Sequence, residues 1–329
     1  MAAASSPRLL VIGGTSFVGR ALIELAVSRE YRVTMFNRGV TNPGLFPEVD
    51  HRVGDRDGGL AALGDDRWDV VVDTCGYVPR VVRDSAALLQ SRVGWYSLVS
   101  SLAVYADFGA RGIDEDAPLA PPPDPPSEDM ALHYGPLKAQ CEGVVAELYP
   151  RRSTMTRCSI IVGPNDPTHR FSYWIARAVE GGTMLAPGDP AQTVQFIDAR
   201  DLAAWLLDSA EHGAAGAFNA AGPREPLTMR EFLEMCAGAS RSDVRFEWRD
   251  DEFMLAHGLA PYFAPPMWVP TTGPMAGLAA ADSSRAIASG LRFRPAVETI
   301  HDTYQWWRQE AKDVPLAWPR AEEARVLGA

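Results

Sequence analysis

Leu9-Leu10-Val11-Ile12-Gly13-Gly14-Thr15-Ser16-Phe17-Val18-Gly19 stands near the start of the chain and joins an apolar run to a glycine-rich turn. The apolar run predicts a buried strand, and residues 18–27 have the spacing of a helix. Gly13 allows a sharp turn, and Gly19 allows the helix to pack close to the strand. Since phosphates bind at helix N-termini, the stretch predicts a site for the pyrophosphate of a dinucleotide. The residues expected to bind it are Gly13, Thr15, Ser16, Phe17, Val18 and Gly19; Ser16 replaces the usual middle glycine, and its hydroxyl could donate to a phosphate.

Strand-like and helix-like segments alternate along the first two thirds of the chain. Strands are predicted at residues 9–12, 31–36, 49–53, 68–72, 95–99, near 158–162, 194–197 and 217–220, and helices at 18–27, around 60, 81–89, 134–148 and 201–209. This alternation is typical of a parallel sheet with helices on both faces. We therefore predict an α/β fold with a doubly wound parallel sheet of the Rossmann type.

Two stretches interrupt the alternation. The run 118–126 holds six prolines, which remove backbone donors and fix φ, so a long loop is predicted. From about Pro223 the pattern becomes irregular and indicates a smaller C-terminal lobe. We expect residues 1–164 and about 193–222 to form the dinucleotide-binding domain. Residues 165–192 and 223–310 are then expected to form the substrate-binding lobe, and 311–329 a C-terminal tail.

The composition narrows the classes of partner. The chain has 329 residues, 47% of them hydrophobic, and a net charge of −11. This charge opposes binding to nucleic acid or to an anionic membrane, because both attract positive surfaces. The four cysteines show neither a metal-binding nor a paired spacing, so we expect reduced thiols and no metal site. No apolar run has the length of a signal peptide or a membrane span, and a cytoplasmic protein is expected.

The second predicted strand ends in Phe36-Asn37-Arg38-Gly39. An acidic residue at this place would accept hydrogen bonds from the adenine ribose, whereas a neutral Asn37 beside Arg38 suits a 2′-phosphate. The pattern favours NADP(H) over NAD(H), although Arg38 could instead be a solvated surface residue. Asp55 follows the third strand and could accept from the adenine amino group or simply form a turn.

Tyr134-Gly135-Pro136-Leu137-Lys138 opens a predicted helix, and the spacing places Tyr134 and Lys138 on one face. A neighbouring ammonium, helped by the positive nicotinamide ring, favours the phenolate, so Lys138 and the cofactor would lower the pKa of Tyr134 toward the range useful for acid–base catalysis. Lys138 could also bind the ribose of the nicotinamide. Ser100 and Ser101 end the fifth strand, where a hydroxyl can donate to a developing oxyanion. A surface tyrosine–lysine pair and strand-capping serines are the alternatives.

In this order, the three elements resemble the extended short-chain dehydrogenase/reductases, also called the NAD-dependent epimerase/dehydratase family. The resemblance runs from Leu9 to about Trp307 and includes the segments 100–105, 161–166 and 195–203. It implies that Ser101 is the catalytic hydroxyl, that Tyr134 is the acid–base, and that Lys138 binds the ribose and adjusts the pKa of Tyr134. It also implies a homodimer formed by the helices 81–89 and 134–148.

Departures from the family pattern indicate an atypical branch. They lie in the glycine turn, in Asn37-Arg38-Gly39 and in Asp73-Thr74-Cys75-Gly76-Tyr77. Cys75 could lie near the nicotinamide ribose or be a small core residue. No acidic pair follows Ser101, so 4,6-dehydratase activity is not expected. On the substrate side, Arg170, Tyr173 and Gln195 are expected beside Ser101, with core packing as the alternative for Tyr173.

The leading hypothesis is an NADP(H)-dependent oxidoreductase that transfers hydride to or from a carbonyl or carbinol carbon of a small polar substrate. The first alternative is a nucleotide-sugar epimerase that retains its cofactor. The second is a non-catalytic dinucleotide-sensing or RNA-associated protein of the same fold. Asn37 and Arg38 favour the NADP(H)-dependent oxidoreductase over the epimerase. The presence of all three residues Ser101, Tyr134 and Lys138 argues against a sensor.

Overall fold

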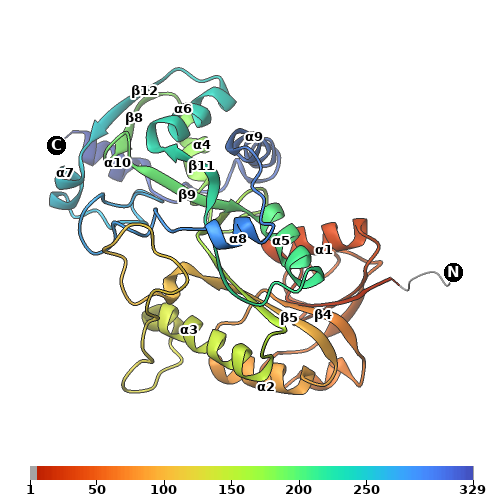
Figure 1. Cartoon of the computed structure of the whole chain (residues 1–329). Coiled ribbons are helices and arrows are strands. Elements are labelled where there is room, and N and C mark those ends of the chain that lie inside the picture. Colours follow the sequence, from red (N-terminus) through yellow and green to blue (C-terminus); the bar gives the residue numbers. More distant parts are fainter. Residues whose placement is uncertain (1–5, 329) are drawn as a thin grey trace.

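The computed structural model describes residues 6–328. A seven-stranded sheet with the order β10-β6-β5-β4-β1-β2-β3 forms the lower half of the molecule in Figure 1, and all its neighbouring strands are parallel. Its strands are β1 (Arg8–Ile12), β2 (Arg32–Asn37), β3 (Asp50–Val53), β4 (Trp68–Asp73), β5 (Val93–Ser101), β6 (Ser153–Cys158) and β10 (Gly216–Ala220). Leu9 to Ile12 are buried, as expected for a central strand covered on both faces. The predicted doubly wound fold is confirmed.

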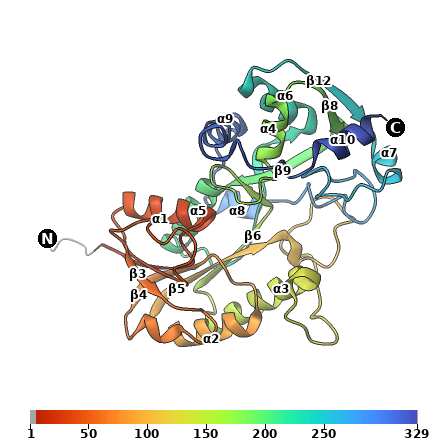
Figure 2. The ribbon, with the colours of Figure 1, turned by 180° about the vertical axis from the view of Figure 1, so that it is seen from behind.

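Helices cover both faces of this sheet. The pair α1 (Phe17–Ser28) and α5 (Ala199–Glu211) packs on one face, and the pair α2 (Pro79–Leu89) and α3 (Met130–Leu148) packs on the other (Figures 1 and 2). The strand order reverses direction between β1 and β4, and ligands of such sheets bind in the crevice at this switch point. The loops after β1 and β4 therefore mark where a dinucleotide would lie.

A second lobe lies at the carboxyl end of β6, where the chain leaves the large sheet. It contains the sheets β11-β9-β7 and β12-β8 and a core built around Phe171, Trp174, Phe232 and Trp268. Its elements are β7 (Ile160–Val162), α4 (Ser172–Val179), β8 (Gly182–Pro187), β9 (Thr193–Asp198), β11 (Gly222–Thr228), α6 (Met229–Ser240), β12 (Val244–Arg249), α7 (Asp251–Ala256), α9 (Ala296–Trp306), a π-helical turn (Trp307–Ala311) and α10 (Arg320–Leu327). The short helix α8 (Ser284–Ala288) instead packs on β10 of the large sheet.

Several predicted elements differ in detail from the structure. The strand expected near 158–162 is two strands, because the chain leaves the large sheet after Cys158 and enters the second sheet at Ile160. The segment around residue 60 is a short 3-10 helix, Leu60–Leu63. The helix expected from Tyr134 begins at Met130, with a kink at His133.

The segment 311–329 is not a tail, and this expectation was wrong. Trp318 and Val326 are buried in the core of the second lobe. The fully buried Glu323 carboxylate accepts from Nε of Arg177 at 2.7 Å and from the backbone N–H of Leu185 at 2.8 Å. The end of the chain is therefore part of this lobe.

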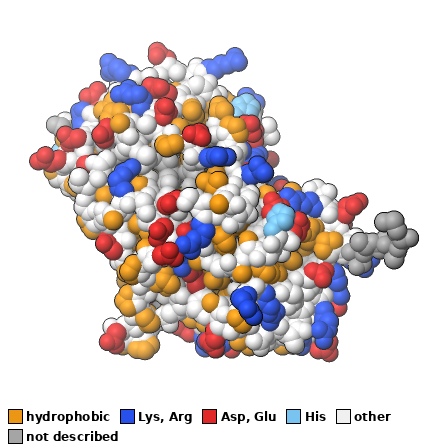
Figure 3. Space-filling model, viewed as in Figure 1, with side chains coloured by type: hydrophobic (Ala, Val, Ile, Leu, Met, Phe, Trp, Pro, Cys, Tyr) orange, Lys and Arg blue, Asp and Glu red, His pale blue; other side chains and the backbone are white. Residues whose placement is uncertain are grey.

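None of the helices within residues 6–328 is long and apolar enough to cross a membrane. On the face seen in Figure 3, acidic and basic side chains are interspersed rather than gathered into patches of one sign.

Candidate active site

The glycine turn between β1 and α1 is a tight backbone cradle. Gly13 and Gly14 have φ values of +112° and +109°, which side chains rarely allow. A Cβ at residue 19 would lie 2.6 Å from the backbone of Gly14, so the first turn of α1 can pack against the loop only because residue 19 is glycine. Ser16 is the N-cap residue of α1, and its hydroxyl makes no capping hydrogen bond. Free N–H groups and this hydroxyl fit a pyrophosphate.

The two polar residues at the end of β2 have different roles: Asn37 stabilises the glycine turn, and Arg38 is exposed at the cavity. The Asn37 amide donates to the carbonyl oxygen of Gly13 at 2.8 Å and accepts from the N–H of Gly39 at 2.8 Å, so it braces the turn. Arg38 is exposed at the cavity wall and has no hydrogen-bond or ion-pair partner within residues 6–328. Asp55 also lines the cavity, and its carboxylate accepts from the N–H of Asp57 at 2.9 Å. Asp55 therefore forms the turn expected as the alternative, and it also lines the cavity where it was predicted to contact the adenine.

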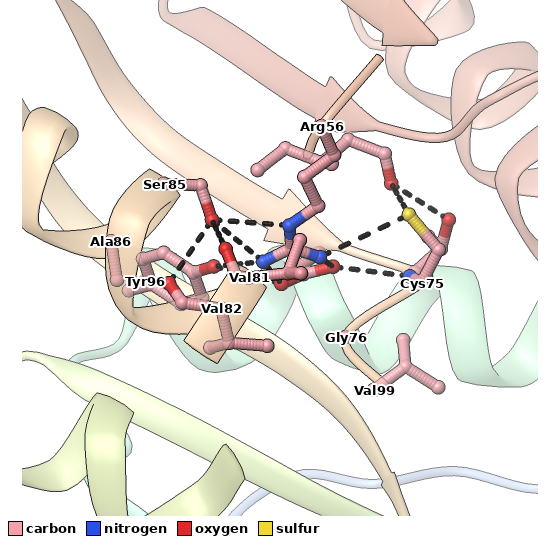
Figure 4. Close-up of polar contacts among 12 residues, drawn as sticks. Arg56, Cys75, Gly76, Val81, Val82, Ser85, Ala86, Tyr96 and Val99 are labelled. Atoms are coloured by element: carbon pink, nitrogen blue, oxygen red, sulfur yellow. Dashed lines mark hydrogen bonds and ion pairs between the residues drawn. The ribbon is translucent and has the colours of Figure 1, made fainter. Parts of the chain in front are cut away.

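A buried ion pair supports the loop after β4. The Arg56 guanidinium donates to both carboxylate oxygens of Asp73, at 2.8 and 2.6 Å, and to the Ser85 hydroxyl (Figure 4). Asp73 also accepts from the N–H of Cys75 at 3.1 Å. Burial raises the pKa of the Cys75 thiol to about 11, so the thiol is neutral and unreactive. Cys75 still lines the cavity, and sequence reasoning gave no sign of Arg56.

The structure separates the two serines at the end of β5. Ser100 is buried and donates to the Glu142 carboxylate at 2.6 Å, which commits it to the core. Ser101 faces the cavity, and its oxygen accepts from the N–H of Ala103 at 3.2 Å. The hydroxyl lies beside the Tyr134 phenol, so both groups can reach the oxygen of one ligand. The geometry therefore selects Ser101 as the hydroxyl of the site.

Helix α3 brings Tyr134 and Lys138 to the same cavity. It can approach the end of β5 because residue 135 is glycine: a Cβ there would lie 2.1 Å from the carbonyl oxygen of Ala103. The Lys138 ammonium is buried and donates to the carbonyl oxygens of Gly76 at 2.7 Å and Val99 at 2.6 Å. The Tyr77 ring lies beside both, 5.4 Å from the Lys138 nitrogen and 6.5 Å from the Tyr134 ring.

The electrostatics of this pair differ from the expectation. Burial raises the pKa of the Tyr134 phenol above its ordinary value, and the adjacent Ser101 hydroxyl only partly opposes this rise. Burial also lowers the pKa of Lys138. The lowering of the Tyr134 pKa expected from Lys138 and the positive nicotinamide ring is not seen in the protein alone, because desolvation of the phenol dominates. Tyr134 is a neutral phenol at neutral pH.

One cavity of about 1160 Å³ joins these parts. It is larger than a typical pocket for one small ligand, so it has room for a dinucleotide and a substrate. The cofactor-binding and catalytic candidates that line it are Gly13, Thr15, Ser16, Phe17, Val18, Gly19, Asn37, Arg38, Asp55, Cys75, Ser101, Tyr134 and Lys138. Among the described residues, no group of three or more His, Cys, Asp or Glu side chains is arranged to hold a metal ion.

The three substrate candidates have different positions. Arg170 lines the cavity with its guanidinium 5.2 Å from the centre of the Tyr262 ring. Gln195 also lines it, but its amide donates to and accepts from the backbone of Ala281, at 2.9 and 2.8 Å. Tyr173 is only 2% exposed, packs against Trp174 and Trp318, and does not line the cavity. Its assignment to the substrate site was wrong, because α4 turns this ring into the core of the second lobe.

Sequence reasoning missed most of the cavity wall that comes from segments far from the glycine turn. This wall is formed by Phe108 of the long loop after β5, Asp166, and Tyr262, Phe263, Met267, Val269, Met275, Leu278 and Ala279 of the irregular segment after α7. The only sequence signal was the aromatic and proline-rich stretch 261–270, which has no periodicity that would show a facing direction.

Residues 85–221, which include Ser101, Tyr134 and Lys138, match the model of the NAD dependent epimerase/dehydratase family. The match covers less than half of the chain and shows the likeness of this part to an epimerase/dehydratase domain. The resemblance inferred from the sequence, and with it the prediction of an enzyme, is confirmed. The search of curated protein sequences found no match.

Solved epimerases and dehydratases share the fold over nearly the whole chain. The UDP-N-acetylglucosamine 4-epimerase of Methanobrevibacter ruminantium, solved with UDP-N-acetylmuramic acid, has a TM-score of 0.69 at 17% identity, covering 93% of this chain and 100% of the other. The UDP-glucuronic acid 4-epimerase of Bacillus cereus, solved with NAD, has a TM-score of 0.65 at 17% identity over 92% and 99%. The dTDP-glucose 4,6-dehydratase of Bacillus anthracis, also solved with NAD, gives 0.65 at 16% over 94% and 98%. These TM-scores show a common fold, and at such low identities the likeness shows the fold alone.

Proposed function

We propose that this protein is an NADP(H)-dependent oxidoreductase that interconverts a carbonyl and a carbinol. The observation that carries the proposal is the single cavity that runs from the glycine turn to Ser101, Tyr134 and Lys138. The glycine cradle and the unengaged Ser16 hydroxyl fit a dinucleotide at one part of the cavity. The Ser101 and Tyr134 hydroxyl groups and the Lys138 ammonium fit the chemistry of a nicotinamide at another part of the cavity.

Each of the three residues has a role that follows from its contacts. A bound nicotinamide dinucleotide would supply or accept the hydride. Ser101, which lies beside the Tyr134 phenol, donates a hydrogen bond to the substrate oxygen. Tyr134 is a protonated phenol and donates its proton to that oxygen during reduction. Lys138 uses two of its three N–H donors on Gly76 and Val99, which leaves the third for a ribose hydroxyl.

The preference for NADP(H) rests on the end of β2. Arg38 presents an unpaired guanidinium at the cavity wall, and a guanidinium binds a phosphate in a bidentate way. Asn37 places no negative charge beside it. A 2′-phosphate at the end of β2 would therefore lie beside the Arg38 cation, with no carboxylate at residue 37.

A nucleotide-sugar epimerase remains the second candidate, because the matched family includes NAD-dependent epimerases and the same three residues would serve it. The two functions differ in cofactor turnover. A reductase consumes free NADPH in proportion to product, whereas an epimerase returns the hydride to its substrate. Measuring NADPH consumption against a panel of carbonyl compounds tests the proposal, and tightly retained cofactor with no consumption on any of them would contradict it.

We also propose a homodimer formed through α2 and α3, and a cytoplasmic location. The two helices lie side by side as an outer layer (Figure 2), joined by the exposed ion pair Arg83–Glu147. The four cysteines are free thiols, which suits a reducing compartment. Sedimentation of the purified protein tests the dimer.

A further inference from the structure

The part of the cavity beyond Ser101 and Tyr134 has an apolar wall. It is lined by Phe108, Phe263, Met267, Val269, Met275 and Leu278, together with the Tyr262 ring. Apart from Phe108, these residues come from the irregular segment after α7. Backbone hydrogen bonds hold this segment against the long loop after β5: the N–H of Gly277 donates to Phe108 at 2.6 Å, and that of Gly112 donates to Ala280 at 2.7 Å.

Positive charge is scarce at this end. The cationic residues lining the whole cavity, within the described chain, are Arg38, Arg56, Lys138 and Arg170. Arg38 lies at the end of β2, Arg56 is ion-paired with Asp73, and Lys138 is held beneath the nicotinamide position. Only Arg170 remains for a substrate. A nucleotide sugar carries a diphosphate, and proteins usually bind such groups with several cations or backbone donors.

Arg170 is itself surrounded by groups that favour an uncharged ligand. Its guanidinium lies 5.2 Å from the centre of the Tyr262 ring, and its Nε donates to the Thr168 hydroxyl at 3.4 Å, a long contact. Asp166 also lines this wall and is 1% exposed, with one carboxylate oxygen that has no hydrogen-bond partner. Asp166 adds no positive charge to this wall, and one arginine suffices to bind a single acceptor oxygen.

We infer that the substrate is a predominantly apolar carbonyl compound or the corresponding alcohol, such as an aromatic or alicyclic ketone, rather than a nucleotide sugar. The inference rests on the proposed function and specifies the substrate class of the same site. The apolar wall binds the ring, and Arg170 binds at most one further acceptor. In reduction, the carbonyl carbon gains a hydride and the oxygen gains the Tyr134 proton, with NADPH oxidised to NADP⁺. The expectation of a small polar substrate is thereby replaced.

The first experiment compares ketones on the full chain with saturating NADPH. For 2-tetralone and 4-phenyl-2-butanone we expect kcat/KM about 100-fold or more above that for dihydroxyacetone, since each methylene in an apolar pocket contributes about 10-fold or more. UDP-glucose should not inhibit 2-tetralone reduction. Faster reduction of dihydroxyacetone, or competition by UDP-glucose, would overturn the inference while leaving the proposed function intact. Calorimetric titration with 2-tetralol and with UDP-glucose, with and without NADP⁺, reports on the same preference even if no ketone is reduced. Failure to reduce any ketone would contradict the proposed function.

A pair of variants links the preference to the wall. Phe263 is 65% exposed at the cavity, so Phe263→Asn should fold normally. It should lower kcat/KM for 2-tetralone about 10-fold or more without changing the KM for NADPH. Val297→Asn, at a 54% exposed position of α9 outside the cavity, is the matched control and should change neither value. Equal effects of the two substitutions would contradict a role of this wall in binding.

Discussion

The Lys138 ammonium donates to the carbonyl oxygen of Gly76 at 2.7 Å and thereby ties α3 to the loop after β4. The same loop is anchored from behind by Asp73, whose carboxylate binds the Arg56 guanidinium and the N–H of Cys75. Burial raises the pKa of Asp73, and the Arg56 guanidinium more than reverses this, so the carboxyl stays ionised. The position of Lys138 therefore depends on an ion pair in the core.

The role of Tyr134 leads to a first prediction. Tyr134→Phe removes only the hydroxyl, so kcat should fall about 100-fold or more, the usual contribution of a general acid–base. NADPH affinity should stay within a few-fold, as measured by fluorescence titration. Tyr77→Phe is the matched control, because Tyr77 lines the same cavity and keeps its ring over Lys138. Full activity in Tyr134→Phe would show that another group transfers the proton.

Arg38 should distinguish the two dinucleotides. Arg38→Ala removes a charge-assisted contact, so the Kd for NADPH should rise about 10- to 100-fold, whereas that for NADH should change little. Arg32→Ala serves as control, since Arg32 is an exposed arginine at the opposite end of the same strand. Equal losses for NADPH and NADH in Arg38→Ala would remove the basis for a 2′-phosphate site.

Gly135 offers a test of positioning without any change in polar groups. In Gly135→Ala the new Cβ would meet the Ala103 carbonyl oxygen, so α3 must shift away from Ser101. A displacement near 1 Å can cost about 100-fold in rate, and we expect a fall in kcat of this order. Gly143→Ala lies in the same helix with no atom within 4 Å of its Cβ, and it should leave kcat unchanged. If both variants keep full activity, close contact between α3 and the end of β5 is not required.

The buried Arg177–Glu323 pair predicts a large effect on stability at the end of the chain. Glu323→Ala leaves a fully buried guanidinium without its carboxylate, which should cost about 3–5 kcal/mol of unfolding free energy. Glu322→Ala, whose carboxylate pairs with Arg325 on the surface, should cost no more than about 1 kcal/mol. Urea unfolding monitored by circular dichroism measures both, and similar values would contradict the packing of α10.

The sheet and the residues that line the cavity at the glycine turn could be predicted from the sequence because their signals are local. A central parallel strand is a continuous apolar run, as in Leu9–Ile12, and the glycine turn needs residues that lie next to one another in the chain. Tyr134 and Lys138 are likewise placed on one face by the helix period alone.

The remaining features depend on contacts between distant segments. Glu323 lies in a charged sequence that resembles a solvated tail, and its burial is explained by Arg177, 146 residues earlier, and by the backbone N–H of Leu185. The apolar wall comes from a segment without periodicity, so the sequence could not show that Met267 and Val269 face the cavity. The pKa of Tyr134 follows from burial, which the helix pattern does not reveal.

Hydride transfer from NADPH is the central claim, and isotope transfer tests it most directly. The protein is incubated with NADPH carrying deuterium at C4 of the nicotinamide and with a reducible ketone, and the product is analysed by mass spectrometry. With both C4 hydrogens of the NADPH replaced by deuterium, we predict one deuterium on the new carbinol carbon and one NADP⁺ formed per alcohol, with none of this in Tyr134→Phe. Cofactor that binds tightly yet yields neither labelled product nor NADP⁺ with any ketone would contradict the proposed reductase.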